Sequence, residues 1–149
     1  MKQITNKQFD RLVERAIRYL TPKAKALMKE CPVLVLNRCE GLEHQPSWGV
    51  LGTFSGTPRN SHGLMPPKIE LYREDICFAN RLSSNKTIIV HIAHIIAHEL
   101  CHYLGADERD AELFNINLTK LGVKNEKDSS NRRQGFFRRT FGGLFGRKR

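Results

Sequence analysis

The stretch from Lys86 to Leu104 constrains the fold of this chain most, because it is the longest continuous helical pattern in the sequence. Its apolar residues cover most of the circumference of a helix: Ile88, Ile89, Ile92, Ile95, Ile96, Ala97 and Leu100. A helix that is apolar on nearly all sides is stable only when other elements surround it. The sequence therefore predicts a buried central helix that ends at Gly105.

The remaining segments up to residue 123 read as shorter elements that can surround this helix. Residues 5–20 carry apolar residues at helical spacing behind a cap at Thr5 or Asn6, and Pro22 suits the first turn of a second helix over 22–28. We also expect a buried strand at 32–36, strands at 48–56 and 68–72, a loop at 57–67, and helices at 73–82 and 106–121.

Positive charge is concentrated at the C-terminal end of the chain. Residues 124–149 contain nine Lys and Arg against two acids, a net charge of +7, so residues 1–123 carry the remaining +3 of the total +10. Apolar content also falls from Lys124 onward. The sequence predicts one domain over residues 1–123 and a basic tail over 124–149 that contains phenylalanine and glycine.

The basic tail has three interpretations. It is a solubilising disordered segment, an anchor to an anionic surface such as a membrane or a partner protein, or a nucleic-acid contact. Phe137, Phe141 and Phe145 recur every four residues among its arginines, but the neighbouring glycines oppose a stable helix.

The first residues lack the apolar core of a signal peptide, and no apolar run approaches the roughly 20 residues of a membrane helix. The four cysteines show no paired metal-binding spacing. These observations favour a cytoplasmic protein with reduced thiols, in which Cys101 is a buried thiol on the central helix.

The central helix contains an H-E-x-x-H motif at His98, Glu99 and His102. Histidines four residues apart share one helix face, so both imidazoles can bind the same Zn²⁺ ion. A glutamate beside that ion can take a proton from water. We therefore expect His98 and His102 to be metal ligands and Glu99 to be the catalytic base. Buried histidines and a buried glutamate in an otherwise apolar helix also need polar partners, which argues against a chance match.

Catalytic zinc usually has a third protein ligand, and several acids after Gly105 are candidates. Glu108 falls on the last position of an H-E-x-x-H-x-x-G-x-x-ligand spacing, and Asp107 lies one residue earlier. Asp110 and Glu112 are more distant alternatives, and Asp110 also suits a helix cap.

His91 and His94 lie near the same helix face, within about 80° of the other two histidines. Packing in the core is the simpler interpretation of this pair, and a second metal site or a substrate contact is the alternative.

Three motifs in order resemble the minimal zincin-like metallopeptidases, and the resemblance runs from about Pro32 to Glu112. The motifs are the G-x-F-x-G-x-P pattern over 52–58, I-x-L-Y-R over 69–73, and H-E-L-C-H-Y-L-G over 98–105. The resemblance implies a small mixed sheet beside the H-E-x-x-H helix, zinc held by His98 and His102, and Glu99 as base. The family pattern has an aspartate three residues after the glycine, where this chain has Glu108.

These features together predict a zinc-dependent peptidase that hydrolyses amide bonds in a peptide or protein substrate. Zincins generally hold an extended peptide along an edge strand, and Val50, Leu51, Gly52 and Thr53 are the residues we expect in that role. The alternative is a catalytically silent zincin-like module, directed by its basic tail to a membrane, protein or nucleic-acid partner.

Overall fold

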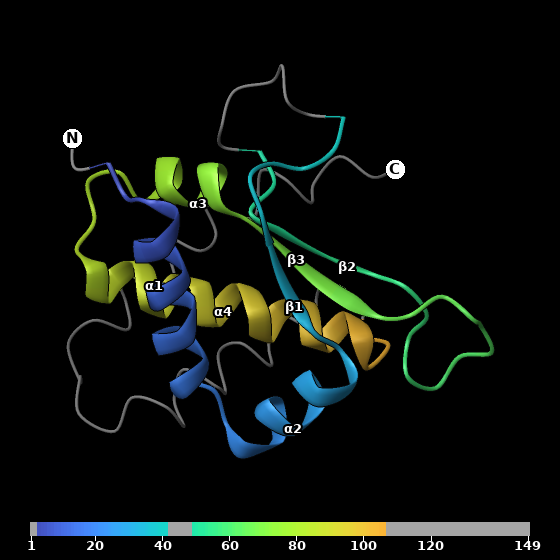
Figure 1. Ribbon diagram of the computed structural model, residues 1–149. Helices are drawn as coiled ribbons and strands as arrows, with labels where there is room; N and C mark the ends of the chain where they lie inside the picture. Colours follow the sequence, from blue (N-terminus) through green and yellow to red (C-terminus); the bar gives the residue numbers. More distant parts are fainter. Residues whose placement is uncertain (1–2, 42–48, 107–149) are drawn as a thin grey trace.

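The computed structural model describes residues 3–41 and 49–106 (Figure 1). The elements are α1 (Asn6–Arg18), α2 (Pro22–Glu30), β1 (Val33–Leu36), β2 (Gly52–Ser55), β3 (Lys68–Tyr72), α3 (Arg73–Ala79) and α4 (Asn85–Tyr103). This is a compact α+β arrangement, which confirms the predicted fold class.

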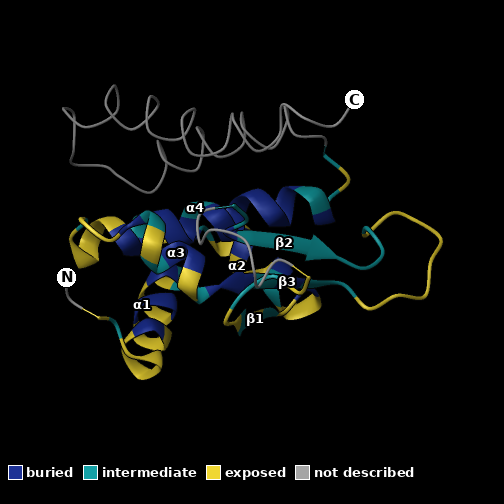
Figure 2. Cartoon of the chain, turned by 90° about the horizontal axis from the view of Figure 1, so that it is seen from above, coloured by how far each residue is buried: buried dark blue, intermediate teal, exposed yellow. Residues whose placement is uncertain are grey.

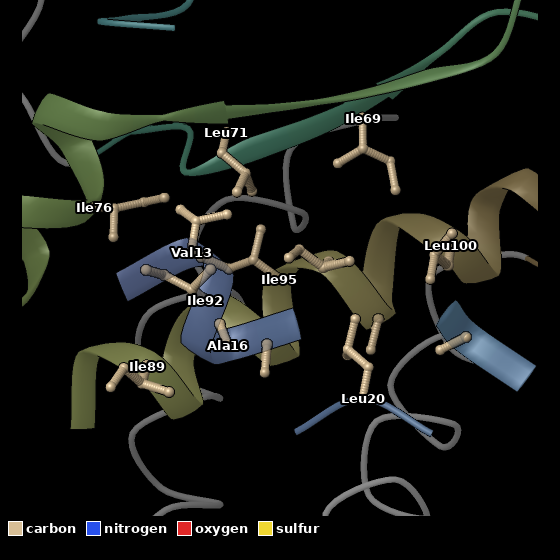
Figure 3. Packing of buried hydrophobic residues seen from close by; sticks show 14 of the residues in the cluster. Val13, Ala16, Leu20, Ile69, Leu71, Ile76, Ile89, Ile92, Ile95 and Leu100 are labelled. Atoms are coloured by element: carbon tan, nitrogen blue, oxygen red, sulfur yellow. The ribbon is translucent and has the colours of Figure 1, made fainter. Parts of the chain in front are cut away.

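Helix α4 is the central element, as its apolar sequence predicts. Figure 1 shows α4 beneath the sheet, with α1 crossing it and α2 near its C-terminal half. Ile92 and Ile95 of α4 are buried in one cluster with Val13 of α1 and Leu71 of β3 (Figure 3). The core therefore lies between the sheet and the helices and forms around α4.

Local sequence signals set the ends of the helices. Thr5 and Gln8 form a reciprocal capping box at the start of α1, and Pro22 occupies the first turn of α2. The Ser84 side chain accepts a hydrogen bond from the Thr87 N–H at the start of α4. Gly105, which follows α4, has a φ of +88°, a left-handed conformation that favours glycine.

The sheet has three strands in the order β1-β3-β2 among the described residues. β1 pairs with β3 in parallel and β2 pairs with β3 antiparallel, so the sheet is mixed. β1 and β2 are therefore its two edges. The strand expected at 32–36 is present as β1, but the expectation that it is buried is wrong. Val33 and Val35 are half-buried against the core, whereas Pro32, Leu34 and Leu36 are exposed.

Two predicted elements are shorter in the structure. The strand expected over 48–56 is limited to Gly52–Ser55, so Val50 and Leu51 precede it, although the Leu51 carbonyl still accepts the Tyr72 N–H. The helix expected over 73–82 ends at Ala79. Asn80 ends it because its side-chain amide donates to the Ile76 carbonyl.

Glycine at position 52 lets β2 approach α4 closely. A Cβ atom on Gly52 would lie 2.7 Å from Cγ2 of Ile95 and 3.0 Å from the carbonyl oxygen of Glu70. Further along, the rings of Phe54 and Tyr103 lie 5.9 Å apart. β2 therefore runs beside α4 from Ile95 toward Tyr103, and Figure 2 shows the two elements side by side.

The cysteines in the described residues are all free thiols, and Cys101 is buried on α4 as expected. No helix in residues 3–41 or 49–106 is long and apolar enough to cross a membrane. The predicted helix over 106–121, the domain end at 123 and the basic tail lie outside the described residues, apart from Ala106.

Gly52→Ala should destabilise the protein by about 1–3 kcal/mol, because the added methyl overlaps Ile95. Gly49→Ala is the matched control, since a Cβ atom at Gly49 meets nothing within 4 Å. Urea unfolding of both variants measures the difference. Equal stabilities of the two variants would contradict the close approach of β2 to α4.

Candidate metal centre

His98 and His102 point their Nε2 atoms toward each other from successive turns of α4. The two Nε2 atoms lie 3.2 Å apart, and the rings are nearly perpendicular, with centroids 4.9 Å apart. Two nitrogens bound to one tetrahedral zinc at 2.0–2.1 Å lie about 3.3 Å apart. The spacing of this pair therefore fits a shared zinc ion without a change of backbone.

A backbone carbonyl orients His102. Its Nδ1 lies 3.0 Å from the carbonyl oxygen of Ala106, which can only accept a hydrogen bond. Nδ1 therefore carries the proton, and Nε2 of the neutral ring presents a lone pair toward His98. The left-handed turn at Gly105 brings the Ala106 carbonyl back to the end of α4. This is the outer hydrogen bond that metal-binding histidines usually make.

His98 is held in the neutral form that metal binding requires. Its side chain is buried, and burial together with the neighbouring His102 lowers the pKa of His98 to about 4. The imidazole is therefore uncharged at neutral pH, and no proton has to leave it before a metal ion binds.

Glu99 is buried on the side of α4 that faces β2. Ile95, Glu99 and Tyr103 are spaced four residues apart, so each side chain is rotated around the helix axis by only about 40° from the one before it. Because Ile95 lies under Gly52 and Tyr103 lies beside Phe54, Glu99 lies between these two contacts. The two histidines are about 60–100° further around the helix, on its flank next to β2.

His91 and His94 do not join this pair in a larger group. His91 is buried and its Nδ1 lies 2.8 Å from Nδ2 and 3.1 Å from Oδ1 of Asn80. Burial lowers the pKa of His91 to about 4, and the charge of His94 makes a smaller contribution in the same direction. His91 is thus a packed core histidine, as the simpler interpretation holds.

The loop between β2 and β3 is tied to the end of α4 next to His102. The Arg59 N–H donates to the Tyr103 carbonyl at 2.8 Å, and the Tyr103 hydroxyl donates to Glu30 at 2.9 Å. Arg59 Nε also pairs with Glu30 at 3.2 Å. The sequence analysis missed this cluster, because Glu30 and Tyr103 are 73 residues apart and no local pattern links them.

The structure thus brings His98, Glu99 and His102 together on α4 beside β2, the strand that contains Gly52 and Thr53. Glu108 and Asp107, the candidates for the third ligand, lie outside the described residues, as do Asp110 and Glu112. Within residues 3–41 and 49–106, no group of three or more His, Cys, Asp or Glu is placed to hold a metal ion. Of the ligands that the sequence predicts, the described residues therefore contain His98 and His102.

Comparison with known proteins identifies the family. A family model described as zincin-like metallopeptidase matches residues 29–116, which is more than half of the chain and includes the H-E-x-x-H helix. The chain therefore belongs to the zincin-like metallopeptidases. No curated protein matches the chain.

The metal-free protein should lose stability as the pH falls from about 6.5 to about 4. His91 and His98 have pKa values near 4 in the folded chain against an ordinary 6.5, so in this range the unfolded chain binds protons that the folded chain does not. The free energy of unfolding therefore decreases toward low pH.

His91→Gln should reduce this pH dependence to roughly half, because one of the two contributions is removed. Urea unfolding at several pH values in the presence of a chelator measures it, with His62→Gln in the exposed loop as the control. A His91→Gln variant with the full pH dependence of the wild type would contradict the buried neutral state of His91.

Proposed function

We propose that this protein is a zinc-dependent peptidase in which His98 and His102 bind the metal and Glu99 is the general base. The 3.2 Å separation of the two Nε2 atoms, directly beside a buried glutamate, is the observation that carries this proposal. Membership of a metallopeptidase family supports the same reaction class. The third ligand in this proposal is Glu108, with Asp107 as the alternative.

In this proposal, different residues of the site have different roles in amide hydrolysis. Zinc, when bound, would act as a Lewis acid that lowers the pKa of water toward about 7. His98 and His102 would hold the ion, and the Ala106 carbonyl accepts from Nδ1 of His102, which leaves Nε2 for the metal. Glu99 takes the proton of the attacking water and delivers it to the leaving amine.

β2 provides the surface for the substrate in this proposal. The Leu51–Tyr72 backbone bond and the β2–β3 register make 51, 53 and 55 the residues that bond to β3. Gly52 and Phe54 consequently direct their backbone N–H and C=O away from β3, at the edge that β2 forms in the described sheet. An extended peptide pairing with this edge would pass beside the metal pair. Thr53 remains a predicted residue of the substrate-binding strand, although its own backbone groups bond to β3.

Other parts of the proposal concern residues or properties beyond the site. Residues 124–149 are proposed as a contact for an anionic membrane, protein or nucleic acid, because of their net charge of +7. A cytoplasmic location is likewise an expectation from the sequence. The alternative function, a silent binding module directed by this tail, differs from the peptidase in the role of Glu99.

Glu99→Gln should lower peptide cleavage by about 10²–10⁴-fold, because the amide cannot accept the proton of water. Zinc content and thermal unfolding should stay close to those of the wild type, since Glu99 is not a proposed ligand. The assay is cleavage of a mixed peptide library, followed by mass spectrometry. The wild type treated with a chelator is a second inactive control.

Two outcomes would contradict the peptidase. Full cleavage by Glu99→Gln would remove the general base from the mechanism. A wild-type protein that retains zinc but cleaves no peptide would favour the binding module.

The outer edge of β2 can be tested through a single backbone N–H. Phe54→Pro deletes the outward-facing N–H of residue 54, whereas Phe54→Ala keeps it, and both variants lose the ring contact with Tyr103. If the substrate pairs with this edge, Phe54→Pro should cleave peptides about tenfold less efficiently than Phe54→Ala, which corresponds to about one hydrogen bond.

The measurement is kcat/KM for peptide hydrolysis, with circular dichroism to compare the folds of the two variants. Equal kcat/KM values in two folded variants would show that the N–H of residue 54 does not bind the substrate. Gly52 is unsuitable for this test because a side chain there overlaps Ile95.

A further inference from the structure

Three consecutive apolar residues, Leu64, Met65 and Pro66, are exposed on the arm of the β2–β3 loop that returns to β3. Leu64 is fully exposed and Met65 is 67% exposed. Figure 2 shows this loop as an exposed segment that projects beyond the sheet. A run of exposed apolar side chains contributes nothing to folding, and in natural proteins it commonly serves binding.

The loop has a defined conformation that holds these side chains outward. At its base the Thr57 N–H donates to the Met65 carbonyl at 3.0 Å. Gly56 has a φ of +107°, and a Cβ atom there would collide with the backbone of Pro66. A Cβ atom on Gly63 would likewise collide with the side chain of Thr57. The exposure of Leu64 and Met65 is therefore set by the backbone of an organised loop.

The position of the loop links Leu64 and Met65 to the candidate metal centre. The loop continues directly from β2, the proposed substrate strand. Within the loop, the Arg59 N–H donates to the Tyr103 carbonyl, and the Arg59 side chain forms an ion pair with Glu30. Tyr103 immediately follows the metal-site residue His102. A peptide that extends along β2 toward its Ser55 end therefore approaches this loop after passing the histidines.

We propose that Leu64 and Met65 form a specificity contact that selects a large apolar side chain of the peptide substrate. The selected side chain belongs to the part of the peptide that lies toward the Ser55 end of β2, next to the scissile bond. This inference rests on the proposed peptidase function and names its substrate class: peptides with a hydrophobic residue beside the cleaved bond.

The size and continuity of the surface favour a peptide side chain over a larger partner. Two exposed side chains offer far less than the roughly 800 Å² per partner that a stable protein interface buries. The same chain segment also supplies both the backbone edge and the apolar side chains, so one extended peptide can use both. A second copy of the chain bound at Leu64 and Met65 is an outcome that the test distinguishes.

The test compares the zinc-loaded wild type with the double variant Leu64→Ser/Met65→Ser and with the control Leu82→Ser. Leu82 is 90% exposed in the turn between α3 and α4, away from the loop, so it controls for loss of an exposed leucine. Each protein is incubated with an equimolar synthetic peptide library, and mass spectrometry gives the residues on both sides of each cleaved bond.

The wild type and Leu82→Ser should prefer Leu, Met or Phe at one position beside the cleaved bond. The double variant should lose about tenfold in kcat/KM for those peptides and stay within about twofold of the wild type for peptides with a small or polar residue there. A purely structural role of the loop would not produce a loss of kcat/KM that is restricted to peptides with an apolar residue beside the cleaved bond.

Several outcomes would overturn the inference. An unchanged preference in the active double variant, or an equal loss for all peptides, rejects the specificity contact and leaves the peptidase intact. A wild type that cleaves nothing rejects the proposed function and the inference with it. A wild-type dimer that becomes monomeric in the double variant, measured by light scattering, assigns Leu64 and Met65 to an interface with a second copy.

Discussion

The packing of α4 against α1 and the sheet fixes the direction of every side chain on that helix. Ile92, Ile95 and Leu100 are buried in the core, so the helix cannot rotate without exposing them. His98 and His102 are consequently held on the flank beside β2, with Nε2 atoms 3.2 Å apart. The hydrophobic core thus fixes the two proposed ligands in place in advance, which would lower the entropic cost of binding a metal ion.

Tyr103 connects that helix to the elements around the candidate site. Its ring contacts Phe54 of β2, its carbonyl accepts the Arg59 N–H of the loop, and its hydroxyl donates to Glu30 of α2. Because Tyr103 directly follows His102, the strand, the loop and the second helix all contact the end of the H-E-x-x-H helix. The edge of β2, the β2–β3 loop and the histidine pair therefore lie in one connected region of the molecule.

Local patterns in the sequence predict most of the fold and the centre of the site. The cap at Thr5, Pro22 in the first turn of α2 and the turn at Gly105 act within a few residues, and the structure follows them. The H-E-x-x-H spacing likewise brings the Nε2 atoms of His98 and His102 close together. Features that depend on tertiary contacts were not predictable in this way. The exposure of Leu34 and Leu36 follows from the absence of a covering layer over β1 in the described residues, which composition does not encode.

The same distinction applies to the ends of shorter elements and to the surroundings of the site. α3 stops at Ala79 because the Asn80 amide bonds back to Ile76 and also meets His91 of α4, a long-range contact. The Glu30–Tyr103 bond joins residues without any shared periodicity. The third metal ligand was predicted at Glu108 or Asp107, outside the described residues, and stays a prediction.

X-ray absorption spectroscopy at the zinc edge, on the full chain loaded with one equivalent of zinc, tests the central claim most directly. The account predicts a first shell of nitrogen and oxygen at about 2.0–2.1 Å, with the outer-shell scattering of two imidazole rings that disappears in the His98→Ala/His102→Ala variant. A first shell of sulfur near 2.3 Å, or an unchanged spectrum in that variant, would contradict it.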